Sequence, residues 1–159
     1  MSKKEKSIEL LNKAVNDELL AVHQYMYFHF RCDDMGFDLV SNLFKRIAIQ
    51  EMMHVEQLAE RILFLKGEVE MKVAGEVRKL TEVKDMLEQA VKMEMNSVDD
   101  YNKWANECAA NADSVSKKLF ETLTAEEEVH QDQFETELDN LEKFGTAYLH
   151  IGGAGRYAG

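Results

Sequence analysis

The chain has 159 residues, of which 45% are hydrophobic and 31% are charged, and its net charge is −11. This length suits one domain with a sizeable core, and the absence of proline favours an all-α fold. The negative charge argues against a nucleic-acid partner, and no apolar stretch is long enough to span a membrane. The first residues lead into an amphipathic helix rather than an apolar signal segment, so we expect a cytoplasmic protein.

Apolar residues recur with the helical period in four long segments. These segments span about residues 6–33, 38–66, 81–110 and 114–143. Short polar turns connect the first pair and the last pair, whereas residues 67–79 form the only long connection. Gly67 is expected to cap the second helix, Gly145 to end the fourth, and an apolar segment after Gly145 to form a short fifth helix.

Two helical hairpins joined by one long crossover predict a ferritin-like four-helix bundle. We assign the bundle and its short fifth helix to residues 1–151, and expect disorder in residues 152–159. The periodicity predicts a core stripe in each long helix. The stripes contain Leu11, Val15, Val22 and Tyr25; Leu43, Phe44, Ile47, Leu58, Ile62 and Leu65; Leu87, Val91, Val98 and Tyr101; and Phe120, Leu123, Phe134, Leu138 and Leu141.

The sequence repeats itself at an offset of 76 residues, which relates its two halves. Each half contains a glutamate, a tyrosine seven residues later, and a Glu-x-x-His motif further on. The shift converts Glu18, Tyr25, Glu51 and His54 into Glu94, Tyr101, Glu127 and His130, and also relates Leu11 to Leu87 and Phe44 to Phe120. The halves are therefore expected to be pseudo-symmetric.

All four of these glutamates and both histidines stand at core positions of the expected helices. Buried carboxylates need a positive charge nearby, and no lysine or arginine occupies the neighbouring stripe positions. Two divalent metal ions balance four carboxylates in formal charge. The six candidate ligands are Glu18, Glu51, His54, Glu94, Glu127 and His130.

Oxygen and nitrogen donors without a thiolate suit iron or manganese, and this arrangement of one Glu from two helices and Glu-x-x-His from two others is that of di-iron carboxylate bundles. By symmetry His54 would bind one iron and His130 the other. Glu18 and Glu94 would be terminal ligands, with Glu51 and Glu127 as bridges. Tyr25 and Tyr101 lie two turns beyond the terminal glutamates and are expected to donate hydrogen bonds to them.

The whole chain resembles bacterioferritins. The resemblance is carried by Glu51-Met52-Met53-His54, by Glu60-Arg61-Ile62-Leu63-Phe64-Leu65-Lys66-Gly67, by the second Glu-x-x-His and by Glu135-Thr136-Glu137-Leu138. It implies a shell of 24 subunits, a ferroxidase that oxidises Fe(II) with O2 or H2O2 at two iron ions per subunit, and storage of ferric mineral. Arg46 and Gln50 depart from the His and Asp with which several bacterioferritins bind iron at the inner surface.

The resemblance also implies haem b between two subunits, with Met52 as the axial ligand from each, and a small electron donor of the ferredoxin type. A second apolar stripe on the same helix supports a dimer interface independently. It comprises Ala48, Ile49, Met52, Val55 and Ala59, and the repeat replaces most of these residues with polar ones. Simple interface packing by Met52 is the alternative, because methionine fills gaps well.

Other functions fit the sequence less well. A rubrerythrin-type peroxidase would add paired CxxC motifs and a further glutamate where Ser97 stands. A classical ferritin normally has one Glu-x-x-His motif, a DNA-binding mini-ferritin places its site between subunits, and a purely structural bundle would leave the carboxylates unpaired. Cys32 and Cys108 are expected to be reduced, and His23, His29 and His150 to be surface or interface residues.

Overall fold

The computed structural model describes residues 1–151 and confirms an all-α fold with the expected order of elements. The four long helices are α1 (Lys3–Asp34), α2 (Asp38–Phe64), α3 (Val83–Ala110) and α4 (Ser114–Phe144), and a short 3-10 helix, η1 (Thr146–His150), follows. The tail predicted to be disordered, 152–159, lies outside the described residues. Among residues 1–151, no helix is long and apolar enough to cross a membrane.

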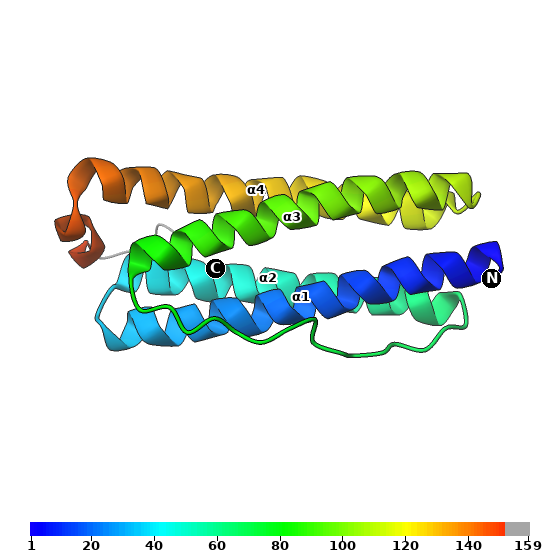
Figure 1. The fold of residues 1–159 in the computed structure, drawn as a ribbon, viewed down its shortest axis with the longest axis horizontal. Helices are drawn as coiled ribbons and strands as arrows, with labels where there is room; N and C mark the ends of the chain where they lie inside the picture. The colour runs from blue at the N-terminus through cyan, green and yellow to red at the C-terminus, as the bar shows by residue number, and fades with distance from the viewer. Residues whose placement is uncertain (152–159) are drawn as a thin grey trace.

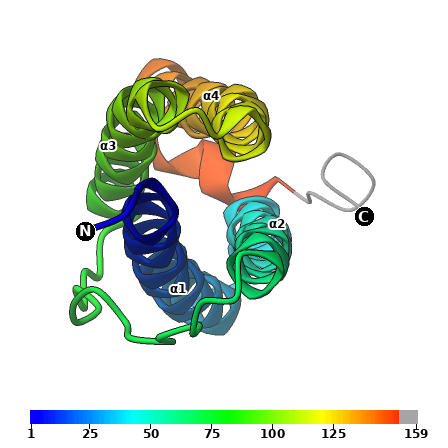
Figure 2. The same ribbon diagram turned by 90° about the vertical axis from the view of Figure 1, so that its right-hand side faces the viewer.

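The helices form two hairpins that lie against each other along the bundle. One hairpin is α1 with α2, the other is α3 with α4, and the long crossover returns along the outside of α1 (Figure 1). Viewed down its length, the bundle has four helices around a central axis, and the crossover covers α1 from outside (Figure 2). This topology brings the middle of all four helices to the same level, where the repeat places its polar residues.

Three amide side chains of α1 hold the crossover in place by hydrogen bonds to the backbone of the crossover. Asn12 donates to the carbonyl of Glu68 and accepts from the amide of Glu70, at 2.9 and 3.0 Å. Asn16 accepts from the amide of Lys72 at 3.0 Å. Gln24 donates to the carbonyl of Arg78 and accepts from its amide, at 3.0 and 2.7 Å. Side chains of α1 thus supply the hydrogen bonds that this irregular segment needs.

The apolar core is divided into two clusters, one toward each end of the bundle. The first is built around Tyr25, Phe28, Phe44 and Phe134, and the second around Leu11, Tyr101, Trp104 and Phe120. Two of the predicted core residues, Val22 and Val98, are only half-buried and belong to neither cluster, so those predictions were wrong. In α1 the core position at this level is taken by Ala21, which is buried, one residue before Val22.

The second helix ends differently from the prediction. Lys66, not Gly67, takes the left-handed conformation, with φ of 67°. The amide of Gly67 then donates to the carbonyl of Ile62 at 2.9 Å, which closes a Schellman-type end. Gly67 is needed for another reason: a Cβ there would lie 2.8 Å from Cγ2 of Ile8. The glycine therefore permits a close approach of the chain to α1.

The two hairpin turns are related by the repeat and share one backbone feature although their sequences differ. Gly36 and Ala112 correspond at the offset of 76, and both have positive φ, 79° and 57°. The left-handed conformation is unfavourable for alanine and not for glycine. A Cβ at Gly36 would meet nothing within 4 Å. An alanine at this position would therefore be unfavourable only because of the backbone conformation.

We expect Ala112→Gly to stabilise the protein by about 1 kcal/mol and Gly36→Ala to destabilise it by about the same amount. Chemical denaturation of the metal-free protein measures both changes. The two substitutions serve as controls for each other, since the same backbone conformation should give opposite signs. Equal signs would contradict this account of the turns.

Candidate metal centre

The six candidate ligands lie together in the middle of the bundle, between the two apolar clusters. Each long helix supplies at least one of them: Glu18 from α1, Glu51 and His54 from α2, Glu94 from α3, and Glu127 and His130 from α4. All six are buried, with at most 3% of the residue exposed. The arrangement predicted from the sequence therefore brings all six residues to one place.

The six residues form two overlapping groups that could each hold a metal ion. One consists of Glu18, Glu51, His54 and Glu127, and the other of Glu51, Glu94, Glu127 and His130. Within each group, one ligand atom per residue lies within 4.8 Å of all the others. Glu51 and Glu127 are common to both groups, which is the position required of bridging carboxylates.

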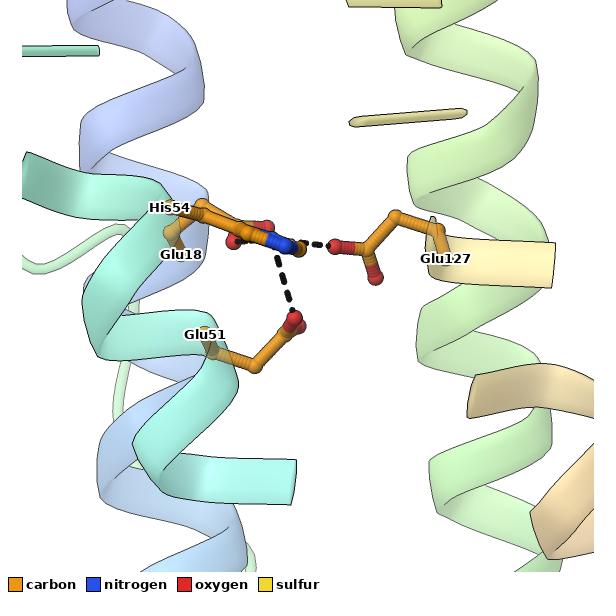
Figure 3. A group of neighbouring side chains, drawn as sticks. All are labelled: Glu18, Glu51, His54 and Glu127. Atoms are coloured by element: carbon orange, nitrogen blue, oxygen red, sulfur yellow. Dashed lines mark hydrogen bonds and ion pairs between the residues drawn. The ribbon is translucent and has the colours of Figure 1, made fainter. Parts of the chain in front are cut away.

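Three carboxylates converge on a single nitrogen of His54. Its Nδ1 lies 2.7 Å from Oε2 of Glu18, 3.2 Å from Oε1 of Glu51 and 2.8 Å from Oε1 of Glu127 (Figure 3). One ring nitrogen carries at most one proton, so it cannot donate to all three oxygens. Ligands bound at about 2.1 Å around one ion lie about 3 Å apart when they are adjacent. The spacing therefore fits a shared metal better than a set of hydrogen bonds.

The second group has the same form around His130. Its Nδ1 lies 3.1 Å from Oε1 of Glu51, 3.7 Å from Oε2 of Glu127 and 3.8 Å from Oε2 of Glu94. The rings of His54 and His130 are nearly parallel, with centroids 5.8 Å apart. Each group thus contains one imidazole, and the two imidazoles lie side by side.

Several polar atoms of the cluster are buried without a hydrogen-bond partner. They are Oε1 of Glu51, Oε2 of Glu94, both carboxylate oxygens of Glu127 and Nδ1 of His130. Ion-pair distances connect some of these atoms, but their directions do not satisfy hydrogen bonds. A buried polar group without a partner is strongly unfavourable, and divalent metals at this level would satisfy all of these atoms at once.

The environment of the cluster raises the pKa values of several of its residues, so the metal-free cluster retains protons. Burial and the neighbouring carboxylates raise the pKa values of Glu18 and Glu94 well above the usual range. Burial alone would lower the histidine pKa values, but surrounding carboxylates raise that of His54 strongly and that of His130 to about 12. Metal ions replace such protons when they bind, because ligands must be deprotonated.

The two tyrosines connect the halves in a crossed pattern that the sequence did not reveal. Tyr25 donates to Oε1 of Glu94 at 2.7 Å, and Tyr101 donates to Oε1 of Glu18 at 2.7 Å. Each tyrosine therefore bonds the glutamate of the other half, not the glutamate on its own helix. Burial and the nearby carboxylates raise the pKa values of both tyrosines, so each hydroxyl keeps its proton and remains a donor.

Two small pockets approach the cluster from opposite sides of the bundle. The pocket between α1 and α3 is lined by Asp17, Ala21, Ser97 and Asp100 and reaches Glu51. Burial, with the charge of Asp100, raises the pKa of Asp17 to about 6. The pocket between α2 and α4 is lined by Gln50, Met53, Gln57, Glu126 and Val129 and reaches both histidines. The buried cluster is thus within reach of small ions and molecules.

The second apolar stripe of α2 is narrower than predicted. Ala48 and Val55 are buried within the subunit, so they are not part of an exposed face. Met52 and Ile49 remain on the surface, with 51% and 43% of each residue exposed. The methionine expected to contact haem therefore lies on the surface of the subunit.

The cysteines and the remaining histidines lie away from the cluster. Cys32 and Cys108 are buried free thiols, as expected. His29 hydrogen-bonds Ser41, and the ring of His150 packs edge-on against Phe37. None of these residues belongs to a metal-binding group within residues 1–151.

Comparison with known proteins identifies the family. The ferritin-like domain family matches residues 8–144. A bacterioferritin of Desulfovibrio desulfuricans is 36% identical over 147 residues, which cover 92% of this chain and 82% of the relative. A bacterioferritin of Brucella melitensis is 38% identical over 141 residues, 88% of this chain and 87% of the relative. This chain belongs to the bacterioferritin family.

Solved structures agree with this membership. The Desulfovibrio desulfuricans bacterioferritin, whose diiron site was observed in different catalytic states, has a TM-score of 0.92 and 34% identity, covering 96% of this chain and 91% of that one. The Rhodobacter capsulatus bacterioferritin, with a metal-free dinuclear site and haem iron, has a TM-score of 0.89 and 30% identity, covering 94% of each chain. Iron storage with a di-iron ferroxidase site is the function of this family, and the carboxylate and histidine cluster is consistent with it.

The stability of the metal-free bacterioferritin should fall as the pH rises from about 5 to 9. The folded cluster holds protons that the unfolded chain releases above a pKa of 4.5 for Glu94 and 6.5 for His130. Each such proton lowers the free energy of unfolding by about 1.4 kcal/mol per pH unit. Urea denaturation at several pH values measures the slope.

Glu94→Gln should make this slope shallower, because the amide does not ionise. The exposed Glu121→Gln is the matched control on α4 and should leave the slope unchanged. A stability that rises over this range in the metal-free protein would contradict the proposed protonation of the cluster.

Proposed function

We propose that this bacterioferritin binds two ferrous ions with Glu18, Glu51, His54, Glu94, Glu127 and His130, oxidises them and stores the ferric product. The observation that carries the proposal is the pair of overlapping ligand groups that share Glu51 and Glu127. We assign these two glutamates as bridges and Glu18 and Glu94 as terminal ligands. His54 and His130 then complete one position each through Nδ1.

The surrounding residues prepare the cluster for this chemistry. Two ferrous ions bound there would supply two electrons. With two protons from solvent, these electrons suffice to reduce one O2 to H2O2 or one H2O2 to two water molecules. Tyr25 and Tyr101 hold the terminal carboxylates in place through their hydroxyl protons. The two apolar clusters exclude water above and below, which strengthens the attraction between carboxylates and cations.

The site residues reach solvent by two routes that suit different species. Asp17 and Asp100 line the pocket on the α1 and α3 side, where paired carboxylates attract ferrous ions. The pocket on the α2 and α4 side opens behind the histidines. We assign the first pocket to the arrival of ferrous iron, since its carboxylates lead directly to the buried Glu51.

The proposal includes the assembly and cofactor of the family. Subunits would pair and assemble into a 24-subunit shell in the cytoplasm, with haem b between the two subunits of a dimer. The exposed thioether of Met52 beside the exposed Ile49 supports an axial role for this residue. A small electron donor of the ferredoxin type would reduce the haem when stored iron is released.

Aerobic addition of ferrous iron to metal-free protein should give a fast ferric absorbance that saturates near two irons per chain, followed by much slower uptake of further soluble iron. Glu127→Ala and His130→Ala should each lose the fast phase by at least about 100-fold, because each change removes a ligand. Glu121→Ala, an exposed change on the same helix, is the control. Fast oxidation in either ligand variant, with circular dichroism unchanged, would contradict the ligand assignment.

Met52→His should change the absorption spectrum of bound haem without changing the helical content, because imidazole replaces a thioether on the haem iron. Met95→His is the matched control, since Met95 is also exposed, with 48% of the residue accessible, but lies on α3. A haem spectrum that is the same in the Met52 variant and the native protein would remove Met52 from this role.

A further inference from the structure

One residue stands behind each histidine of the cluster, on the side away from the carboxylates. Nε2 of His54 lies 3.1 Å from Oε2 of Glu126, and Nε2 of His130 lies 2.7 Å from Oε1 of Gln50. The contacts are crossed, because Glu126 is on α4 and Gln50 is on α2. Each histidine is therefore held from behind by the opposite hairpin.

These two residues correspond to each other in the repeat, since a shift of 76 takes Gln50 to Glu126. Within residues 1–151, the side chains outside the cluster that contact its six ligands by a hydrogen bond or an ion pair are the two tyrosines, Gln50 and Glu126. Tyr25 and Tyr101 are identical in type, as are the corresponding ligands. The contacts around the two halves of the cluster thus differ in one chemical respect. His54 has a carboxylate behind it, and His130 has a neutral amide.

We propose that Glu126 and Gln50 make the two metal positions unequal, so that the position beside His54 binds a divalent cation more tightly than the position beside His130. This inference rests on the proposed function, because it concerns the same two metal positions. It adds an order to them: the His54 position fills first, and the His130 position fills second and empties first.

The physical reason lies in the proton on Nε2. Nδ1 of each histidine faces the carboxylates, so metal binding at Nδ1 leaves the proton on Nε2. This proton lies toward Gln50, which His130 hydrogen-bonds, or toward Glu126, which is within ion-pair distance of His54. A carboxylate acceptor draws this proton more strongly than an amide and makes the imidazole a better electron donor to the metal. Such partners change metal affinity by about 10–100-fold. The side chain of Glu126 is 48% exposed, so solvent weakens the effect and we expect about tenfold.

The location of both residues makes the inference accessible to mutation. Gln50 and Glu126 line the same pocket between α2 and α4, together with Met53, Gln57 and Val129. Glutamate and glutamine have nearly the same shape, and exchange at the wall of an open pocket disturbs no packed core. Glu126→Gln, Gln50→Glu and the double exchange therefore change the charge behind the histidines with little change in volume.

The test is an anaerobic titration of the metal-free protein with Co(II), followed by the absorbance of the bound ion. The native protein should bind two ions in two steps that differ about tenfold in affinity. Glu126→Gln should weaken the first step until the two merge. Gln50→Glu should strengthen the second step with the same merging, and the exposed Glu121→Gln should behave as the native protein.

Crystals loaded with less than one Co(II) per chain identify which position fills first. Anomalous scattering should appear beside His54 in the native protein and beside His130 in the double exchange, an outcome that a general loss of structure does not produce. Two steps of equal affinity in the native protein, or Glu126→Gln with an unchanged titration, would overturn this inference and leave the proposed function intact. Failure to bind two ions per chain would overturn both.

Discussion

The burial of four carboxylates at one level of the bundle is the constraint on which the rest of the structure depends. Glu18, Glu51, Glu94 and Glu127 are each no more than 1% exposed, and the remaining nearby polar groups do not satisfy all their oxygens. Such an arrangement is unfavourable unless cations join it. The apolar clusters on both sides supply the stability that lets the polar layer persist, and each cluster contains one tyrosine that hydrogen-bonds into the layer.

The duplicated sequence explains why neither hairpin contains the site by itself. Each potential metal position takes three residues from one hairpin and one from the other, and Glu51 and Glu127 belong to both. The tyrosines and the residues behind the histidines cross between hairpins as well. Docking of the two halves therefore assembles the centre, and metal binding in turn holds the halves together.

Much of the fold and of the metal centre could be predicted from the sequence, because the residues that the repeat relates also stand at core positions of the helical period. The four helices, the long crossover and the six clustered side chains follow from spacing alone. Other features depend on how the helices pack against one another. Tyr25 hydrogen-bonds Glu94 rather than Glu18, and Val22 is only partly buried. Helix spacing shows which face a residue occupies but not which neighbouring helix it meets.

The details of the chain path were also beyond the sequence. Nothing in residues 67–79 indicates that Asn12, Asn16 and Gln24 bind that segment, because amides on a helix face usually bond water. Gly67 suggested a helix cap, but Lys66 takes the left-handed conformation and Gly67 allows contact with Ile8. The contacts of the histidines with Gln50 and Glu126 run between the two hairpins, so the spacing within one helix does not reveal them.

The most direct test of the central claim is an anomalous diffraction measurement at the iron edge, on crystals loaded anaerobically with ferrous iron. The account predicts two peaks per subunit in the middle of the bundle, one beside Nδ1 of His54 and one beside Nδ1 of His130, with the carboxylates of Glu51 and Glu127 between them. A single central peak, or iron bound only at the surface of the bundle, would contradict it.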